Sequence, residues 1–186
     1  MKRIAIFASG SGSNAQRIAE YFKGSQEAEV SLILTNNPQA GVIERARKLN
    51  IPVVVFNKNI FYKSGNIVRL LKDSKTDLVV LAGFMMLIPE EMVKAFPDRI
   101  VNIHPALLPK YGGKGMYGHF VHEAVVAAKE PESGITIHYV DEHYDEGAII
   151  FQATCQLEPT DTPETVAAKV QQLEHDHFPK VIHQIL

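Results

Sequence analysis

Cysteine is almost absent from this sequence, which has Cys155 as its single cysteine among 186 residues. One cysteine cannot form an intrachain disulfide, and it leaves no spaced cysteines for a zinc ribbon or a redox pair. Because no base lies near it in the sequence, a buried structural thiol is favoured over a nucleophile. The cysteine content therefore predicts a protein of the reducing cytoplasm.

An excess of charge of one sign is also missing. The chain has 19 Lys and Arg residues against 21 Asp and Glu residues, so its formal net charge is −2. This balance does not create the positive field on which nucleic-acid binding depends, and we expect no nucleic acid as a partner.

Long apolar runs are lacking as well. The N-terminal apolar run, residues 4–8, is too short for the core of a secretory signal and far below the ~20 residues of a membrane helix. No association with a membrane is expected.

No internal repeat, low-complexity stretch or linker divides the sequence. Hydrophobic residues make up 46% of the chain and charged residues 22%, which is ordinary for a folded protein with a sizeable core. The sequence therefore predicts one domain over residues 1–186, and we expect it to be a monomer or a homodimer.

Apolar runs of strand length alternate with segments of helical period, a pattern typical of a largely parallel sheet. Helices fill the gaps, the first over 14–23 with Gly24 as its end signal and the second over 42–49. The expected fold class is α/β, with a Rossmann-like open, twisted, mostly parallel sheet that has helices on both faces. The predicted strands are 3–8, 30–35, 52–56, 77–83 and 99–103.

The pattern changes beyond residue 104. Residues 105–115 have the turn chemistry of a long loop, and a helix is predicted over 121–129. Two strand-like runs, 135–140 and 148–153, are so close in sequence that they predict an antiparallel hairpin near the C-terminus. A last helix begins near residue 163, and Pro179 is expected to break or kink it.

The first predicted strand runs directly into a glycine-rich segment, residues 9–15. Its glycines allow backbone N–H groups at the start of a helix to point toward an anion, for which phosphate is the natural ligand. Gly10, Gly12 and Ala15 also satisfy the dinucleotide pattern G-x-G-x-x-G/A. However, residues 35–37, where a ribose-binding acid belongs, are Thr-Asn-Asn. A phosphomonoester site is favoured, with a dinucleotide site and a purely structural turn as the alternatives.

A polar pair stands at the end of the fifth predicted strand. Side chains alternate along a strand, so Asn102 and His104 face one side and Ile103 the other. Ligands of open α/β sheets bind outside the carboxyl ends of the strands, so we expect this pair and the glycine-rich loop to flank one crevice. An amide donor beside an imidazole suits oxyanion stabilisation and acid–base catalysis. A histidine that is merely hydrogen-bonded is the alternative.

An acidic turn, residues 141–147, separates the two runs of the predicted hairpin. Its simplest interpretation is a solvated turn, and it is not a calcium loop, because Glu146 stands where the sixth position requires glycine. A carboxylate of this turn could instead reach His104. It would then raise the pKa of the imidazole above its ordinary ~6.5, so that a cation persists near neutrality.

Other chemistries find little support in the sequence. The eight histidines include only two close pairs, 119 with 122 and 175 with 177, and neither has metalloprotease spacing, so no metal is expected. The Walker A motif and the G-x-S-x-G elbow of serine hydrolases are absent. Met85 and Met86 follow the fourth predicted strand, where they fit either the core or an apolar pocket.

Four segments, in order along nearly the whole chain, resemble the folate-dependent formyltransferases. The Asn-Ile-His-Pro segment is shared by these transferases and the formyltetrahydrofolate hydrolases, while the first loop points to the members that act on glycinamide ribonucleotide. The resemblance implies transfer of the formyl group of the cosubstrate 10-formyltetrahydrofolate to the amine of glycinamide ribonucleotide, without a metal, in purine biosynthesis. The segments are 10–14 (GSGSN), 81–85 (LAGFM), 102–111 (NIHPALLPKY) and 145–147 (DEG).

The resemblance implies three catalytic residues. Asn102 donates to the tetrahedral oxyanion, and protonated His104 stabilises it and supplies a proton toward the leaving N10. Asp145 keeps His104 charged. A formyltetrahydrofolate hydrolase that uses the same residues and a phosphate- or nucleotide-binding module without catalysis are the alternative functions.

The resemblance also implies binding residues. The substrate phosphate falls on Gly12, Ser13 and Asn14, and the phosphoribosyl part falls on Gln171 and Glu174. One departure from the relatives is the absence of a basic residue at position 86, and residues 58 and 63, both lysines, are candidates for holding the folate glutamate tail. The implied folate pocket consists of Met85, Met86, Leu87, Ile88, Val140, Asp141, Glu142, His143 and Tyr144.

Overall fold

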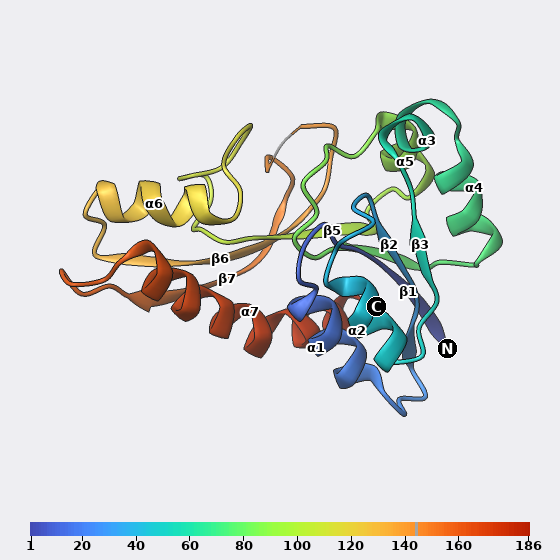
Figure 1. The fold of residues 1–186 in the computed structure, drawn as a ribbon, viewed down its shortest axis with the longest axis horizontal. Coiled ribbons are helices and arrows are strands. Elements are labelled where there is room, and N and C mark those ends of the chain that lie inside the picture. Colours follow the sequence, from blue (N-terminus) through green and yellow to red (C-terminus); the bar gives the residue numbers. More distant parts are fainter. Residues whose placement is uncertain (144) are drawn as a thin grey trace. The chain divides into compact units, whose positions relative to one another are not determined.

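The computed structural model describes residues 1–143 and 145–186 (Figure 1). Within this part of the chain the strands form one mixed sheet in the order β3-β2-β1-β4-β5-β6-β7, which confirms the predicted mostly parallel α/β fold. The strands are β1 (Lys2–Phe7), β2 (Ala28–Thr35), β3 (Val53–Val55), β4 (Leu78–Leu81), β5 (Ile100–His104), β6 (Glu132–Tyr139) and β7 (Ile149–Gln156). The helices are α1 (Ser13–Phe22), α2 (Val42–Lys48), α3 (Lys58–Lys63), α4 (Asn66–Asp73), α5 (Glu90–Ala95), α6 (His119–Ala127) and α7 (Pro163–Ile185).

The described chain divides into two compact units. The N-unit comprises Met1–Val101 with Leu186, and the C-unit comprises Asn102–Ile185. The assignment of residues 1–186 to one domain stays a prediction. No helix of the described residues combines the length and the apolar character that crossing a membrane requires.

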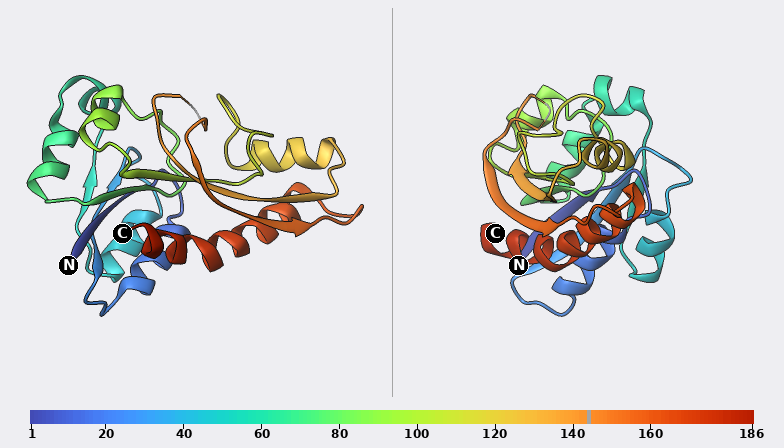
Figure 2. Two further views of the ribbon diagram at one scale, coloured as in Figure 1. Left: turned by 180° about the vertical axis from the view of Figure 1, so that it is seen from behind. Right: turned by 90° about the vertical axis from the view of Figure 1, so that its left-hand side faces the viewer.

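The N-unit is built on strands that are apolar along almost their whole length. β1 pairs in parallel with β2 and β4, and β2 pairs in parallel with β3. The last four residues of β1, Ile4 to Phe7, are fully buried, as expected for a strand that is covered on both faces. Crossovers of the usual hand place α1 and α2 on one side of these strands and α3, α4 and α5 on the other (Figure 1, Figure 2).

Two loops of the N-unit leave neighbouring parallel strands at the same edge. One follows β1 and the other follows β4, and Ser9 N donates to Gly83 O at 3.0 Å between them. The helix after the first loop ends as predicted, because Gly24 adopts a φ of +79° just beyond its last turn. This edge is where ligands of open α/β sheets bind.

In the C-unit, β6 and β7 form the predicted antiparallel hairpin. α7 packs against both strands and against α6. Of the two outcomes expected at Pro179, a break does not occur, since α7 continues to Ile185. Phe178, Val181 and Ile182 around the proline are buried, which offsets the cost of about 3 kcal/mol for a proline inside a helix.

Cys155 lies in β7, two residues beyond the predicted strand 148–153, and it is half-buried rather than buried. Burial raises the pKa of its thiol. The thiol is therefore protonated at neutral pH, which agrees with a structural role.

Candidate active site

The end of β5 carries the polar pair that was expected from strand alternation. His104 is the last residue of the strand and is only 3% exposed, and Asn102, two residues earlier, is half-buried. The acidic turn brings Asp145 to both of them, with its Oδ2 3.6 Å from His104 Nδ1 and its Oδ1 3.5 Å from Asn102 Nδ2. The three residues implied as catalytic therefore form one cluster within the C-unit.

The hydrogen bonds of His104 define which ring nitrogen carries the proton. Nε2 lies 2.7 Å from the carbonyl oxygen of Tyr111. A carbonyl only accepts, so Nε2 carries a hydrogen and donates it. In the neutral ring Nδ1 is then the basic atom, and it faces the carboxylate of Asp145.

Burial lowers the pKa of His104 below its ordinary value. The charge of Asp145 and the carbonyl of Tyr111 act in the opposite direction, and the ring of His138 adds to the lowering. The expectation that His104 stays a cation near neutrality is therefore wrong. Asp145 raises the pKa as expected, but the cost of burying an imidazolium is larger.

Asn102 is oriented by a histidine that the sequence analysis did not single out. His138 is 2% exposed, and its Nδ1 lies 2.8 Å from the carbonyl oxygen of Tyr139, so Nδ1 carries the hydrogen. With the hydrogen on Nδ1, Nε2 accepts from Asn102 Nδ2 at 3.1 Å, and Asp145 Oδ1 lies 3.6 Å from the same Nε2. The sequence did contain a signal for His138. It is a polar residue in an otherwise apolar strand, and strand alternation places it on the same face as Thr136.

The carboxylate of Asp145 is held in its charged form. Although burial acts to raise the pKa of this carboxyl group, the ring of His138, the positive charge that His104 carries when it is protonated and the N–H of Gly113 together hold it below its ordinary value. Gly113 N donates to Oδ2 at 3.0 Å. Asp145 has a φ of +56°, an uncommon conformation that aspartate tolerates better than most residues.

The glycine-rich loop of the N-unit is held by backbone contacts. Gly12 has a φ of +76° directly before α1, and an added Cβ there would lie 2.8 Å from the Cα of Val42. Val42 N donates to Gly10 O at 3.2 Å, and Arg45 Nε donates to Ser11 O at 2.8 Å. The loop therefore lies tightly against the start of α2.

Ser13 and Asn14 begin α1, and Asn14 is buried. A dinucleotide site requires an acidic residue at the end of β2, where this chain has Asn36. Asn36 Oδ1 accepts from Ser9 Oγ at 2.6 Å. The N-unit thus offers backbone N–H groups at a helix start, in the geometry that suits a phosphate.

The residues implied in the folate pocket differ in exposure. Met85 is 55% exposed whereas Ile88 is 3% exposed, with Met86 and Leu87 half-buried between them. Met85 N donates to Ser9 Oγ at 3.1 Å, and Leu87 O accepts from Tyr62 Oη at 2.9 Å. Met85 thus presents an apolar side chain to solvent while its backbone is fixed.

The remaining implied binding residues lie in the acidic turn and on α7. Asp141 accepts from His143 N at 2.8 Å, as is typical of a tight polar turn. Val140 is half-buried, Glu142 is exposed, and Tyr144 lies outside the described residues. Residues 171 and 174 of α7, Gln and Glu, are one turn apart and share a face of the helix.

The lysines proposed for the folate tail, Lys58 and Lys63, begin and end α3. His119 and His122 both lie on α6, where His119 Nε2 pairs with Glu123 at 2.9 Å. In the described part of the chain no three potential metal ligands gather into a site.

A family model and several solved structures are similar to this chain. A family model described as formyl transferase matches residues 2–182. The chain belongs to this family. Solved structures similar to it include a phosphoribosylglycinamide formyltransferase from Bacillus halodurans (TM-score 0.89, 41% identity, 100% of this chain and 95% of that chain). A glycinamide ribonucleotide transformylase 1 from Geobacillus kaustophilus is also similar (TM-score 0.90, 38% identity, 100% and 99%).

Curated relatives carry the same kind of name. The chloroplastic phosphoribosylglycinamide formyltransferase of Arabidopsis thaliana is 44% identical over 99% of this chain, which spans 65% of that relative's length. The phosphoribosylglycinamide formyltransferase of Bacillus subtilis is 39% identical over 100% of this chain and 95% of its own length. The chain thus spans just under two thirds of the plant relative and nearly all of the bacterial one.

Proposed function

We propose that this protein transfers the formyl group of 10-formyltetrahydrofolate to the amine of glycinamide ribonucleotide, a reaction of purine biosynthesis. The observation that carries the proposal is the buried cluster of Asn102, His104 and Asp145 in a member of the formyl transferase family. Relatives that are named for this activity match the chain over nearly its whole length, which supports the choice of acceptor.

The proton balance of the reaction gives His104 its role. The attacking amine must lose a proton after it bonds to the formyl carbon, and N10 of the folate must gain one as its bond to that carbon breaks. Because Nε2 donates to Tyr111, the basic atom of neutral His104 is Nδ1. Nδ1 takes the proton from the amine and passes it to N10, so the ring is neutral before and after the reaction.

Asp145 stabilises the imidazolium that exists between these two transfers. Its Oδ2 lies 3.6 Å from His104 Nδ1, and its low pKa keeps it charged at neutral pH. This role requires no cation in the resting enzyme, which agrees with the lowered pKa of His104.

Asn102 supplies a donor for the oxyanion that forms on the formyl oxygen. One of its amide hydrogens is held by His138 at 3.1 Å. The other faces Asp145 at 3.5 Å, which is at the limit of a hydrogen bond. This second N–H is the one that turns to the oxyanion, because breaking so weak a contact costs little.

Binding roles follow from the same family assignment. The phosphate of the ribonucleotide binds the backbone N–H groups of residues 12–14, and Gln171 and Glu174 contact its phosphoribosyl part. The pterin binds along residues 85–88 and 140–144. We further propose that the protein acts in the cytoplasm, as a monomer or a homodimer, and that residues 1–186 form one catalytic domain.

A single assay tests this function. The protein is incubated with 10-formyltetrahydrofolate, with and without glycinamide ribonucleotide, and deformylation is followed. Turnover only with the ribonucleotide supports the transferase. Equal turnover without it would identify a hydrolase, and binding of the folate without any turnover would identify a binding module.

A further inference from the structure

The carbonyl that accepts from His104 belongs to a residue with an uncommon backbone conformation. Tyr111 lies seven residues beyond His104 and has a φ of +56°. A non-glycine residue holds this conformation only when its surroundings fix it. What fixes Tyr111 therefore also fixes the oxygen that lies 2.7 Å from His104 Nε2.

Two kinds of contact hold Tyr111. Its ring packs against the buried cluster of Ala106, Val121 and Val125. Its hydroxyl donates to Glu130 Oε1 at 2.9 Å, across 19 residues of sequence. The ring and the hydroxyl thus fix the side chain at both ends.

Glu130 is itself anchored at this place. Its backbone N donates to Val125 O at 3.3 Å, at the end of α6, and both its carboxylate oxygens accept from Lys110 Nζ, at 3.1 and 3.2 Å. The hydrogen bond from Tyr111 and the ammonium of Lys110 hold the pKa of Glu130 below its ordinary value. Burial, with Glu130 adding to the effect, raises the pKa of the Tyr111 hydroxyl. At neutral pH the pair is therefore a carboxylate and a neutral hydroxyl.

We propose that Tyr111 and Glu130 form a positioning pair that acts through the Tyr111 carbonyl to keep the proton of neutral His104 on Nε2. This inference rests on the proposed function in one respect, since it leaves Nδ1 as the atom that exchanges protons in the transfer. Neither side chain touches the substrates in this scheme. The effect reaches His104 only through the backbone of residue 111.

Tyr111→Phe tests the pair by removing one oxygen while the ring keeps its packing. We expect kcat to fall about 3- to 10-fold, the value of one ordinary hydrogen bond, with the KM of both substrates within about twofold. Tyr117→Phe is the matched control, because Tyr117 lies in the same loop, is 45% exposed and has its ring against Phe120. A fall in kcat for both variants alike would overturn the proposal.

A conservative change at the other partner separates positioning from bulk stability. Glu130→Gln keeps an oxygen that accepts from Tyr111, so it should retain most of the activity that Glu130→Ala loses. In the double variant Tyr111→Phe/Glu130→Ala, the loss should be no larger than in the single variants, because both remove the same bond. Additive losses would show that the two residues act separately and would contradict the pair.

The tautomer of His104 gives a readout that does not depend on activity. In ¹⁵N NMR spectra of the wild-type protein, Nε2 of His104 should be the protonated nitrogen, and Tyr111→Phe should populate the Nδ1–H form. The groups that face His104 besides Tyr111 are Asp145, His138 and His122, and all three are unchanged in the variant. An unaltered tautomer would overturn the pair. A shifted tautomer in a protein without transferase activity would keep the pair and reject the proposed function.

Discussion

The glycine-rich loop of the N-unit and the cluster of Asn102, His104 and Asp145 in the C-unit are built from different chemistry. The loop is a backbone site, in which Gly10, Ser11 and Gly12 are fixed by a positive φ and by contacts to the start of α2. The cluster is a side-chain site, in which the amide of Asn102 and the ring of His104 are fixed by buried partners. We therefore expect the loop to respond to changes of backbone conformation, and the cluster to changes of single functional groups.

The largest effects are expected from the cluster. His104→Ala and Asn102→Ala should each lower kcat by two orders of magnitude or more, since one preorganised donor to an oxyanion is worth about 10²–10³ in rate. Steady-state kinetics measure the loss, and thermal melts with binding of a folate analogue show that the variants are folded. Near-normal turnover in either variant would remove that residue from the mechanism.

The glycine-rich loop should lose affinity for its ligand when a substitution strains its backbone. Gly12→Val places a branched side chain at a φ of +76°, which costs about 1–3 kcal/mol, and its Cβ would lie 2.5 Å from the Cβ of Val42. We expect the affinity for the ribonucleotide, measured by calorimetry, to fall by more than about tenfold.

A second glycine provides the control for this prediction. Gly24 has a similar φ of +79°, and nothing lies within 4 Å of an added Cβ. Gly24→Val should therefore lose stability without losing ribonucleotide affinity. Equal losses of ribonucleotide and folate-analogue binding in Gly12→Val would indicate misfolding, and unchanged ribonucleotide binding would exclude the loop from the site.

Asp145→Asn removes the negative charge of the cluster while it keeps the shape of the side chain. Asp145 raises the pKa of His104, so its loss should move that pKa further below the ordinary value. In the proposed mechanism His104 acts in its neutral form, so the acid limb of the kcat profile should shift to lower pH. NMR titration of the His104 ring in both proteins measures the shift directly. If the pKa of His104 is the same in the wild-type protein and in the variant, Asp145 is only a residue of the turn and does not act on His104.

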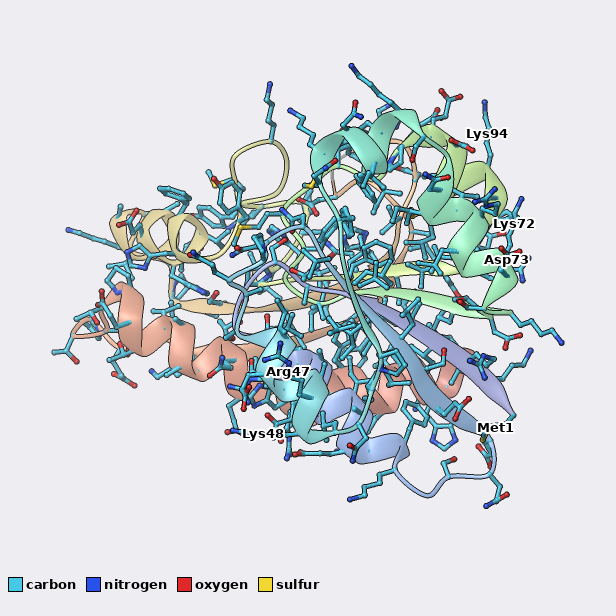
Figure 3. The ribbon with its side chains drawn as sticks, turned by 45° about the vertical axis from the view of Figure 1, so that its right-hand side comes forward. Met1, Arg47, Lys48, Lys72, Asp73 and Lys94 are labelled. Atoms are coloured by element: carbon cyan, nitrogen blue, oxygen red, sulfur yellow. The ribbon has the colours of Figure 1, made fainter. Side chains whose placement is uncertain are left out.

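The smallest effect is expected from an arginine beside the loop. Arg45 Nε donates to Ser11 O at 2.8 Å, so Arg45→Met should weaken ribonucleotide binding by about 2- to 10-fold with kcat unchanged. Arg47, labelled in Figure 3, lies on the same helix with its side chain 73% exposed. Arg47→Met removes the same charge and should have no such effect. Equal losses in both variants would mean that only the net charge of α2 matters.

The sequence predicted the fold well where one local signal dominates. Continuous apolar runs such as Ile4 to Phe7 identified the parallel strands, and Gly24 identified the end of the first helix. At Pro179 the expected break did not occur, because burial along α7 outweighs the local rule for helix interruption. Strand alternation predicted correctly that Asn102 and His104 share a face.

The sequence could not predict how buried the site is or which backbone atoms complete it. The pKa of His104 depends on desolvation, which no motif reports, so the net direction came out opposite to the expectation. The acceptor for its Nε2 is the backbone carbonyl of a residue in an irregular loop. Because every residue has a backbone carbonyl, no residue type in the sequence marks this acceptor. His138 was missed because a lone histidine in an apolar strand resembles a core residue.

The fate of the formyl carbon distinguishes transfer to the ribonucleotide from hydrolysis. The protein is incubated with 10-formyltetrahydrofolate labelled with ¹³C in the formyl group and with glycinamide ribonucleotide, and the products are followed by ¹³C NMR. Our account predicts that the label appears in the formamide of the ribonucleotide at the rate at which the folate loses it. Label that appears as free formate at that rate, with the ribonucleotide unchanged, would contradict the account.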